Sequence, residues 1–286
     1  MKVRDRDLRI LKFGLEQKFL TLLQIAKKFF SESRDILHRP MKRVCELVEA
    51  GLLRVERPNV SDKRFYVVTP EGVKLLNKHN LAGGLRAIKE IDYRTFEHDE
   101  WVTNVRIIFE ELLDLHDWVP ERAFKKGNVK KKVPDGWIPY DGGNLIVEVE
   151  KTLKNKRYYE RVFADACIPD HKDDVFLYIT AKEADKQWLM KQADGWELIY
   201  FATMDELTNM QSKMRFRNSQ GHEFKLRRQY LGGVHFNVPK GNNFSGDGGL
   251  EAIYKGERKY KQINAECRKL RAQGLSEEEI DKLLGD

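Results

Sequence analysis

Three carboxylates near the middle of the chain could form a metal-dependent catalytic centre. Asp135 follows Pro134, and Glu148 and Glu150 stand a short distance further on, in the apolar segment 145–150. Because side chains in a strand alternate between its two faces, Glu148 and Glu150 are expected to share one face. Two carboxylates that point the same way repel each other unless a cation or water separates them. With Asp135 alongside, the three acids are predicted ligands for Mg²⁺ or Mn²⁺ with open positions for a phosphate.

The composition favours a polyanionic partner. The chain has 286 residues, a net charge of +7 and a hydrophobic fraction of 41%, which indicates one large or two ordinary domains. Cys45, Cys167 and Cys267 show no metal-ligand spacing, so a zinc site or a disulfide framework is disfavoured and the cytoplasm is the expected location. No apolar stretch is long enough to cross a bilayer, and residues 1–7 alternate in charge, so neither a membrane span nor a signal peptide is expected.

Residues 1–78 are predicted to form one N-terminal domain. The capping-box sequence Thr21-Leu22-Leu23-Gln24 predicts the start of a helix, and Gly51 predicts the end of another. Pro70 after Thr69 is tolerated at the first position of a helix. In chain order, the predicted elements are helices from 7, over 25–30 and over 38–50, strands over 52–56 and 65–68, and a helix from 70.

This order of elements closely resembles a winged helix-turn-helix domain, and the segments 49–53 and 68–72 match that superfamily. The resemblance implies that the third helix enters the major groove of DNA and that the hairpin contacts the DNA backbone. The predicted DNA-binding residues are Arg34, His38, Arg39, Lys42 and Arg43, with Lys63 and Arg64 on the hairpin. Two alternatives remain: the cations only solvate the domain, or the domain docks another protein.

The second domain is predicted at 95–215, after a linker at 79–94 that contains Gly83-Gly84. An amphipathic helix is predicted over 98–115, strands over 145–150, 174–180 and 196–201, and helices over 154–166 and 181–193. This order is that of the restriction-endonuclease-like core, so the expected fold class is α+β or α/β with a mixed central sheet. Residues 216–286 are predicted to be a basic, Gly-rich and helical extension in which the segment 215–230 tracks a nucleic-acid backbone or closes the domain as one more hairpin.

Residues 7 to about 205 resemble the plasmid replication-relaxation and mobilisation-relaxase group, in which a winged helix precedes a core similar to PD-(D/E)xK nucleases. The phrases that carry the resemblance are His98-Asp99, Asn104-Val105-Arg106, Trp118-Val119-Pro120-Glu121-Arg122, Pro134-Asp135, and Glu148-Val149-Glu150-Lys151-Thr152 through Lys154, Arg157 and Tyr158. The resemblance implies a DNA-binding protein of a mobile element that nicks or relaxes DNA. Other replication or mobilisation proteins and a second copy of the chain are further candidate partners.

One position departs from the family pattern, which would have lysine where this chain has Glu150. Lys151 is predicted on the opposite face of the strand, so Lys154 at the start of the following helix is the better candidate for a lysine that stabilises charge on phosphorus. The predicted catalytic residues are therefore Asp135, Glu148, Glu150 and Lys154. Tyr158 or Tyr159 could act as a covalent nucleophile, but the alternative that one packs and the other lies at the surface is favoured.

Two functions are consistent with these patterns. The first is a DNA-nicking enzyme guided to its site by the winged helix. The alternative is a catalytically retired nuclease fold that acts as a DNA-binding replication-initiation or transcription factor. Both predict DNA binding, so the acids around Asp135 and Glu148 are what separate the two hypotheses.

Overall fold

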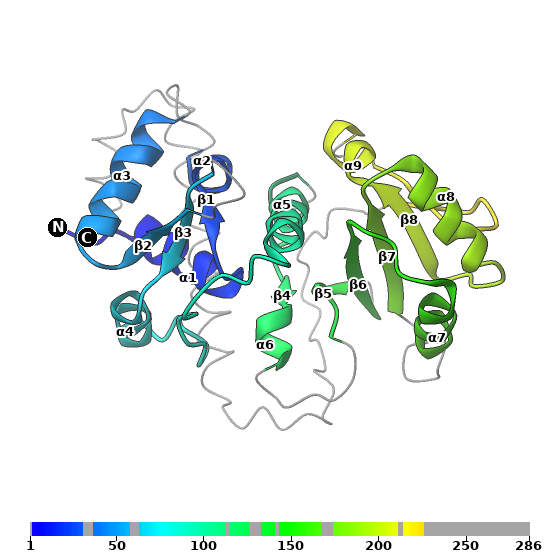
Figure 1. Cartoon of the computed structure of the whole chain (residues 1–286), viewed down its shortest axis with the longest axis horizontal. Coiled ribbons are helices and arrows are strands. Elements are labelled where there is room, and N and C mark those ends of the chain that lie inside the picture. The colour runs from blue at the N-terminus through cyan, green and yellow to red at the C-terminus, as the bar shows by residue number, and fades with distance from the viewer. Residues whose placement is uncertain are drawn as a thin grey trace.

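The protein is a mixed α+β chain with two β-sheets (Figure 1). A computed structural model describes residues 2–30, 37–57, 63–112, 115–125, 133–140, 143–166, 174–210 and 214–225. Among the helices of these segments, none combines the length and the apolar character that a membrane span requires.

The N-terminal part contains four helices and a small sheet among the described residues. Its elements are α1 (Asp5–Glu16), β1 (Leu20–Thr21), α2 (Leu22–Phe29), α3 (His38–Glu49), β2 (Leu53–Glu56), β3 (Phe65–Val68) and α4 (Pro70–Lys78). The strand order is β1-β3-β2 with antiparallel pairing throughout. Apolar side chains from α1, α2, α3 and the sheet form one core.

Local sequence signals explain several of these element ends. At the start of α2, the backbone N–H of Gln24 donates to Thr21 Oγ1 over 3.2 Å, and the Thr21 N–H donates to Gln24 Oε1 over 2.9 Å. The predicted capping box is therefore confirmed. Gly51 after α3 has a φ of +69°, a conformation that glycine adopts without steric cost. Thr69 Oγ1 accepts from the Gly72 N–H over 3.1 Å and caps α4 as expected.

The remainder of the chain is built around a seven-stranded mixed sheet with the order β10-β9-β8-β7-β6-β5-β4. Strands β6, β7 and β8 are parallel to one another, and the outer pairs are antiparallel. The elements are α5 (Phe96–Leu112), β4 (Val119–Pro120), α6 (Glu121–Lys125), β5 (Gly136–Tyr140), β6 (Gly143–Glu150), α7 (Lys156–Ala166), β7 (Asp174–Thr180), α8 (Glu183–Gln192), β8 (Ile199–Thr203), α9 (Met204–Met210), β9 (Phe216–Arg217) and β10 (Glu223–Phe224).

Helices cover both faces of this sheet. Leu145, Val147 and Val149 of β6 pack in a core that includes α5 residues, whereas Ile146 packs in a second core with residues of α7 and α8. Figure 1 shows α5 on one side of the sheet and α7 and α8 on the other. Each strand residue of β6 is therefore assigned to one face by its position in the alternation.

Helix α5 also belongs to the N-terminal core. Ile107 packs with the N-terminal part, while Phe109 on the same helix packs against the large sheet. Arg106 pairs with Glu16 of α1 at 2.8 Å and with Glu110 at 2.6 Å, and Lys28 of α2 pairs with Glu110 at 2.6 Å. Burial alone would raise the pKa of Glu110, but the two cations outweigh it and lower the pKa to about 2.

The predicted strands at 145–150 and 174–180 are confirmed, and the strand expected at 196–201 lies at 199–203. Strand β5 was not predicted, because Gly136 and Pro139 are residues that normally weaken or interrupt a strand. The hairpin alternative for the segment after 215 is present, since β9 pairs with β10. Arg34 and all predictions beyond residue 225 lie outside the described residues.

Candidate functional site

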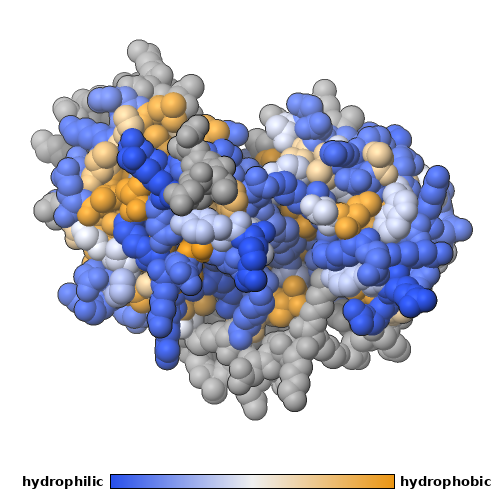
Figure 2. Space-filling model, viewed as in Figure 1, coloured by the Kyte–Doolittle hydropathy of each residue, from blue (hydrophilic) through white to orange (hydrophobic). Residues whose placement is uncertain are grey.

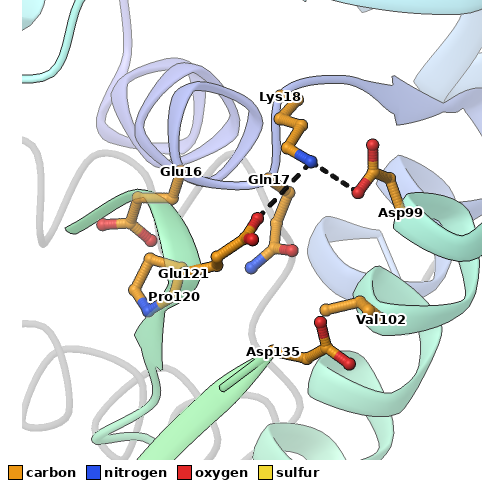
Figure 3. A pocket seen from close by; sticks show the side chains of 8 residues that line it. All are labelled: Glu16, Gln17, Lys18, Asp99, Val102, Pro120, Glu121 and Asp135. Carbon is orange, nitrogen blue, oxygen red and sulfur yellow. Dashed lines mark hydrogen bonds and ion pairs between the residues drawn. The ribbon is translucent and has the colours of Figure 1, made fainter. Parts of the chain in front are cut away.

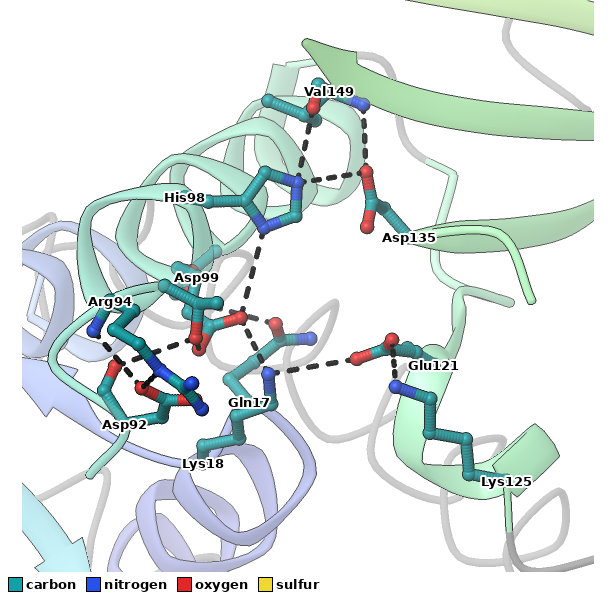
Figure 4. Close-up of polar contacts among 12 residues, drawn as sticks. Gln17, Lys18, Asp92, Arg94, His98, Asp99, Glu121, Lys125, Asp135 and Val149 are labelled. Atoms are coloured by element: carbon teal, nitrogen blue, oxygen red, sulfur yellow. Dashed lines mark hydrogen bonds and ion pairs between the residues drawn. The ribbon is translucent and has the colours of Figure 1, made fainter. Parts of the chain in front are cut away.

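Asp135 immediately precedes β5, and its carboxylate contacts the backbone of β6. Its Oδ2 accepts a hydrogen bond from the Val149 N–H over 2.8 Å and lies 3.2 Å from Nε2 of His98. The same His98 nitrogen lies 3.1 Å from the carbonyl oxygen of Val149 (Figure 4). His98 lies in the first turn of α5, so the carboxylate that precedes β5, a backbone carbonyl of β6 and an imidazole of α5 meet at one point.

His98 carries a positive charge in this environment. Burial alone would lower its pKa, but the carboxylates of Asp135 and Asp99 outweigh burial and raise the pKa to about 10. The ring is therefore an imidazolium at neutral pH, and its Nε2–H is shared between Asp135 and Val149. On the other side of the ring, Nδ1 lies 3.8 Å from Asp99 Oδ1.

A polar cleft lies beside this contact, between the end of α1 and the large sheet (Figure 3). Lys18 Nζ lies 2.6 Å from Asp99 Oδ1 and 3.6 Å from Glu121 Oε2. Lys18 adopts a φ of 75°, which is uncommon for a residue other than glycine. The cleft holds about 280 Å³, part of it open to solvent, and Asp135 lines its wall.

Glu148 and Glu150 are buried on the face of β6 that α7 covers, the same face as Ile146, so the predicted alternation is confirmed. Glu150 Oε2 lies 2.5 Å from Lys154 Nζ, which brings together the acid and the lysine that the sequence analysis selected. Among the described residues, Glu150 Oε1 and the hydroxyl of the buried Tyr178 have no hydrogen-bond partner. A buried polar atom without a partner is costly, so this face can accept a further polar or charged group.

The three predicted metal ligands are not assembled as one group in this arrangement. Among the described residues, no set of three or more His, Cys, Asp or Glu side chains is placed to hold a metal ion. The Asp135 contacts with His98 and the Val149 N–H account for this, because they direct the Asp135 carboxylate toward α5. Mg²⁺ or Mn²⁺ binding by Asp135, Glu148 and Glu150 therefore stays a prediction.

The two tyrosines of α7 differ in their surroundings. Tyr159 is fully buried, and its hydroxyl accepts a hydrogen bond from the Lys154 backbone N–H over 3.2 Å. Burial raises the pKa of the Tyr159 hydroxyl, which makes the phenolate nucleophile harder to form. Tyr158 is half-buried, and Lys154 Nζ lies 5.2 Å from the centre of its ring. This arrangement matches the alternative in which one tyrosine packs and the other lies near the surface.

Some of the predicted DNA-binding side chains are exposed, and others form ion pairs within the protein. His38, Arg39, Lys42 and Arg64 are exposed. Arg43 is not, because its guanidinium donates to Asp7 Oδ1 over 2.7 Å and to the Lys2 carbonyl over 2.9 Å, and it also pairs with Glu46. In this arrangement Arg43 joins α3 to α1 and is not presented to a ligand.

Lys63, the second of these paired side chains, reaches α5. Its Nζ lies 2.8 and 2.9 Å from the two carboxylate oxygens of Glu100. The side chain of Lys63 is still 57% exposed, whereas that of Glu100 is 13% exposed. The cation is therefore held by a carboxylate but stays accessible to a competing anion.

Sequence reasoning missed His98, Lys18 and Glu100 as parts of these sites. His98 and Asp99 stood in one of the phrases that carry the family resemblance, and this phrase was the only signal for either residue. Nothing in the local sequence connects Lys18 with Glu121, or Lys63 with Glu100, because the chain must fold before they meet.

Comparison of the chain with protein-family models, with curated proteins and with solved structures found no match.

Proposed function

We propose that the protein binds DNA through its N-terminal part, acting as a winged helix-turn-helix domain. The element order α1-β1-α2-α3-β2-β3-α4 and the three-stranded antiparallel sheet support this proposal. In that architecture the third helix enters the major groove and the β2–β3 hairpin contacts the backbone.

The exposed face of α3 is the observation that carries the proposal. Val44 and Leu47 anchor the helix in the core, and the opposite side presents Arg39 and Lys42 to solvent. Within the described part of the chain, neither cation has an ion-pair partner. When such a basic helix face binds DNA, it displaces counterions that are condensed on the phosphate backbone. The release of these counterions favours association.

The test is the salt dependence of binding to a fluorescein-labelled duplex. The double variant Arg39→Gln/Lys42→Gln is expected to weaken binding and to lower the slope of log K against log salt by roughly 0.9 for each phosphate that is no longer neutralised. The matched control, Arg86→Gln/Lys89→Gln, removes the same charge from exposed positions outside α3. Equal slopes for the two double variants would show that α3 does not contact DNA.

A second candidate function is metal-dependent cleavage of DNA, and the Oε1 atom of buried Glu150, which has no hydrogen-bond partner among the described residues, favours it. Glu148 and Glu150 fit a hard cation, but Asp135 joins them only after its contact with His98 breaks. A bound Mg²⁺ or Mn²⁺ would polarise a phosphate and lower the pKa of a bound water. Lys154, whose Nζ contacts Glu150, would hold a phosphate oxygen near the site.

Two measurements separate cleavage from DNA binding alone. Nicking of supercoiled plasmid in Mn²⁺ or Mg²⁺ by the wild type, but not by Glu148→Gln, is expected if the centre is active. Calorimetric titration with Mn²⁺ should show saturable binding that Glu148→Gln weakens. If the folded wild type binds DNA yet neither nicks it nor binds Mn²⁺, the DNA-binding role in replication initiation or transcription is the one supported.

A further inference from the structure

Helix α7 presents two arginines that no described carboxylate neutralises. Arg157 and Arg161 are both exposed, and neither guanidinium has an ion-pair partner among the described residues. Most other cations of the large-sheet part are paired, for example Lys151 with Glu97 and Lys186 with Glu206. The two arginines therefore belong to the minority of described cations in this part of the chain that have no ion-pair partner there.

The geometry of α7 holds these two side chains outward. Tyr159 and Phe163 are fully buried and pack in the core beneath the helix. An α-helix advances about 100° per residue, so Arg157 and Arg161 lie on the side opposite this anchored pair. Residues four apart on a helix have Cβ atoms about 6 Å apart, and both guanidinium groups can reach neighbouring phosphates of one strand.

Further cations surround the arginine pair. Lys154 precedes α7 and is 47% exposed although it contacts Glu150. Lys156 pairs with Glu160 only across 3.6 Å, with both side chains more than half exposed, so this pair has little energetic weight. Figure 2 shows strongly hydrophilic side chains gathered over the region that α7 occupies in Figure 1.

We propose that the basic surface formed by Lys154, just before α7, and by Arg157 and Arg161 on the outer face of α7 binds the phosphate backbone of duplex DNA. The proposal rests on the DNA-binding function and adds a second contact surface to the one on α3. Guanidinium groups suit this role because they donate two parallel hydrogen bonds to a phosphate. The Lys154 Nζ lies 5.2 Å from the centre of the half-buried Tyr158 ring, in the first turn of α7.

This basic surface lies next to a carboxylate of β6 through Lys154. Lys154 contacts buried Glu150, so a phosphate bound by Lys154 would lie close to this carboxylate of β6. Figure 1 shows α3 and α7 at opposite ends of the molecule. One protein therefore touches DNA at two separated places, either on two segments or on one long segment that follows the surface.

The experiment uses the full chain and a mixed-sequence duplex of about 60 base pairs, because non-specific binding is dominated by phosphate contacts. The variant Arg157→Gln/Arg161→Gln is compared with Arg86→Gln/Lys89→Gln, which removes an equal charge from exposed positions. The α7 variant is expected to lower the salt slope by roughly 1.8, and the control should leave it at the wild-type value. Circular dichroism melting curves should be the same for all three proteins, since the substituted side chains are exposed.

The outcomes keep this inference separate from the proposed function. If the α7 variant matches the control while Arg39→Gln/Lys42→Gln lowers the slope, the α7 surface is refuted and the α3 assignment stands. If only the α7 variant lowers the slope, the inference stands and the α3 assignment fails. A lower slope with duplex RNA of the same sequence but not with DNA would overturn the assignment of DNA as the partner.

Discussion

Removing the negative charge of Glu100 should strengthen DNA binding by releasing Lys63. The hairpin lysine of a winged helix is expected to meet the DNA backbone, but Glu100 of α5 holds the Lys63 ammonium with both carboxylate oxygens at 2.8 and 2.9 Å. Under the proposed function, DNA phosphate and Glu100 would therefore compete for one cation. In Glu100→Gln the competitor becomes a neutral amide, while the backbone carbonyl of residue 100 still accepts from the Gln24 side chain.

The magnitude follows from the exposure of the pair. The side chains of Lys63 and Glu100 are 57% and 13% exposed, so the pair is partly screened and is worth about 0.2–1 kcal/mol. Since about 1.4 kcal/mol corresponds to a tenfold change, affinity for DNA should rise by about 1.4- to 5-fold at low salt. The gain should shrink as ionic strength rises, because screening weakens the pair and the phosphate contact together.

Fluorescence anisotropy with a fluorescein-labelled duplex measures this gain at about 50 mM and about 200 mM salt. The Lys63→Gln background is the control, since Glu100→Gln should have no effect when there is no ammonium to release. An equal gain in both backgrounds would mean that Glu100 acts only through its general charge. No gain in either background would refute the idea that Lys63 contacts DNA.

Three further predictions concern stability. Arg43→Met leaves the buried carboxylate of Asp7 without its main partner and should lower the free energy of unfolding by about 3 kcal/mol. Urea denaturation measures this loss, and an unchanged midpoint would contradict the structural role of Arg43. The pKa of His98 is raised to about 10, above its value near 6.5 in an unfolded chain. The charged His98 therefore stabilises the folded state fully below pH 6.5, and this stabilisation is lost as the pH rises through 10. The melting temperature of the wild type should therefore exceed that of His98→Gln by an amount that falls between pH 6.5 and 10, and a constant difference would exclude this charge effect. Gly136→Ala places a Cβ against the indole of Trp118 and should lower the free energy of unfolding by about 1–3 kcal/mol. The near-ultraviolet circular dichroism spectrum should change as well. A wild-type spectrum and wild-type stability would show that the indole moves without cost.

Elements set by local signals could be predicted from the sequence. Thr21 and Gln24 cap α2, Gly51 follows α3, and Thr69 caps α4, because each of these signals acts within a few residues. Strand β5 could not be predicted in the same way. Its Gly136 lies against Trp118 and its backbone pairs with β4 and β6, so long-range contacts offset the weak strand preference of its residues.

The candidate site shows the same division. Strict alternation in β6 was enough to place Glu148 and Glu150 on one face. The helix predicted from 154 begins at Lys156, so Lys154 reaches Glu150 from the segment before α7 and not from its first turn. The direction of the Asp135 carboxylate was not available from spacing, because His98 arrives from a helix far earlier in the chain. The acids of a strand can be assigned to a face from sequence, but their partners are decided by packing.

Helix α5 packs in the cores of both parts of the protein, and this limits where the chain can be divided. Ile107 and Arg106 complete the apolar core and the buried charge network of the N-terminal part, although both follow the predicted linker at 79–94. A fragment that ends within that linker would lack both residues, so Glu16 would lose its ion pair with Arg106 and Lys28 its ion pair with Glu110. The N-terminal part is therefore not a cassette that can be exchanged at the linker, and any graft onto another protein has to carry α5 with it.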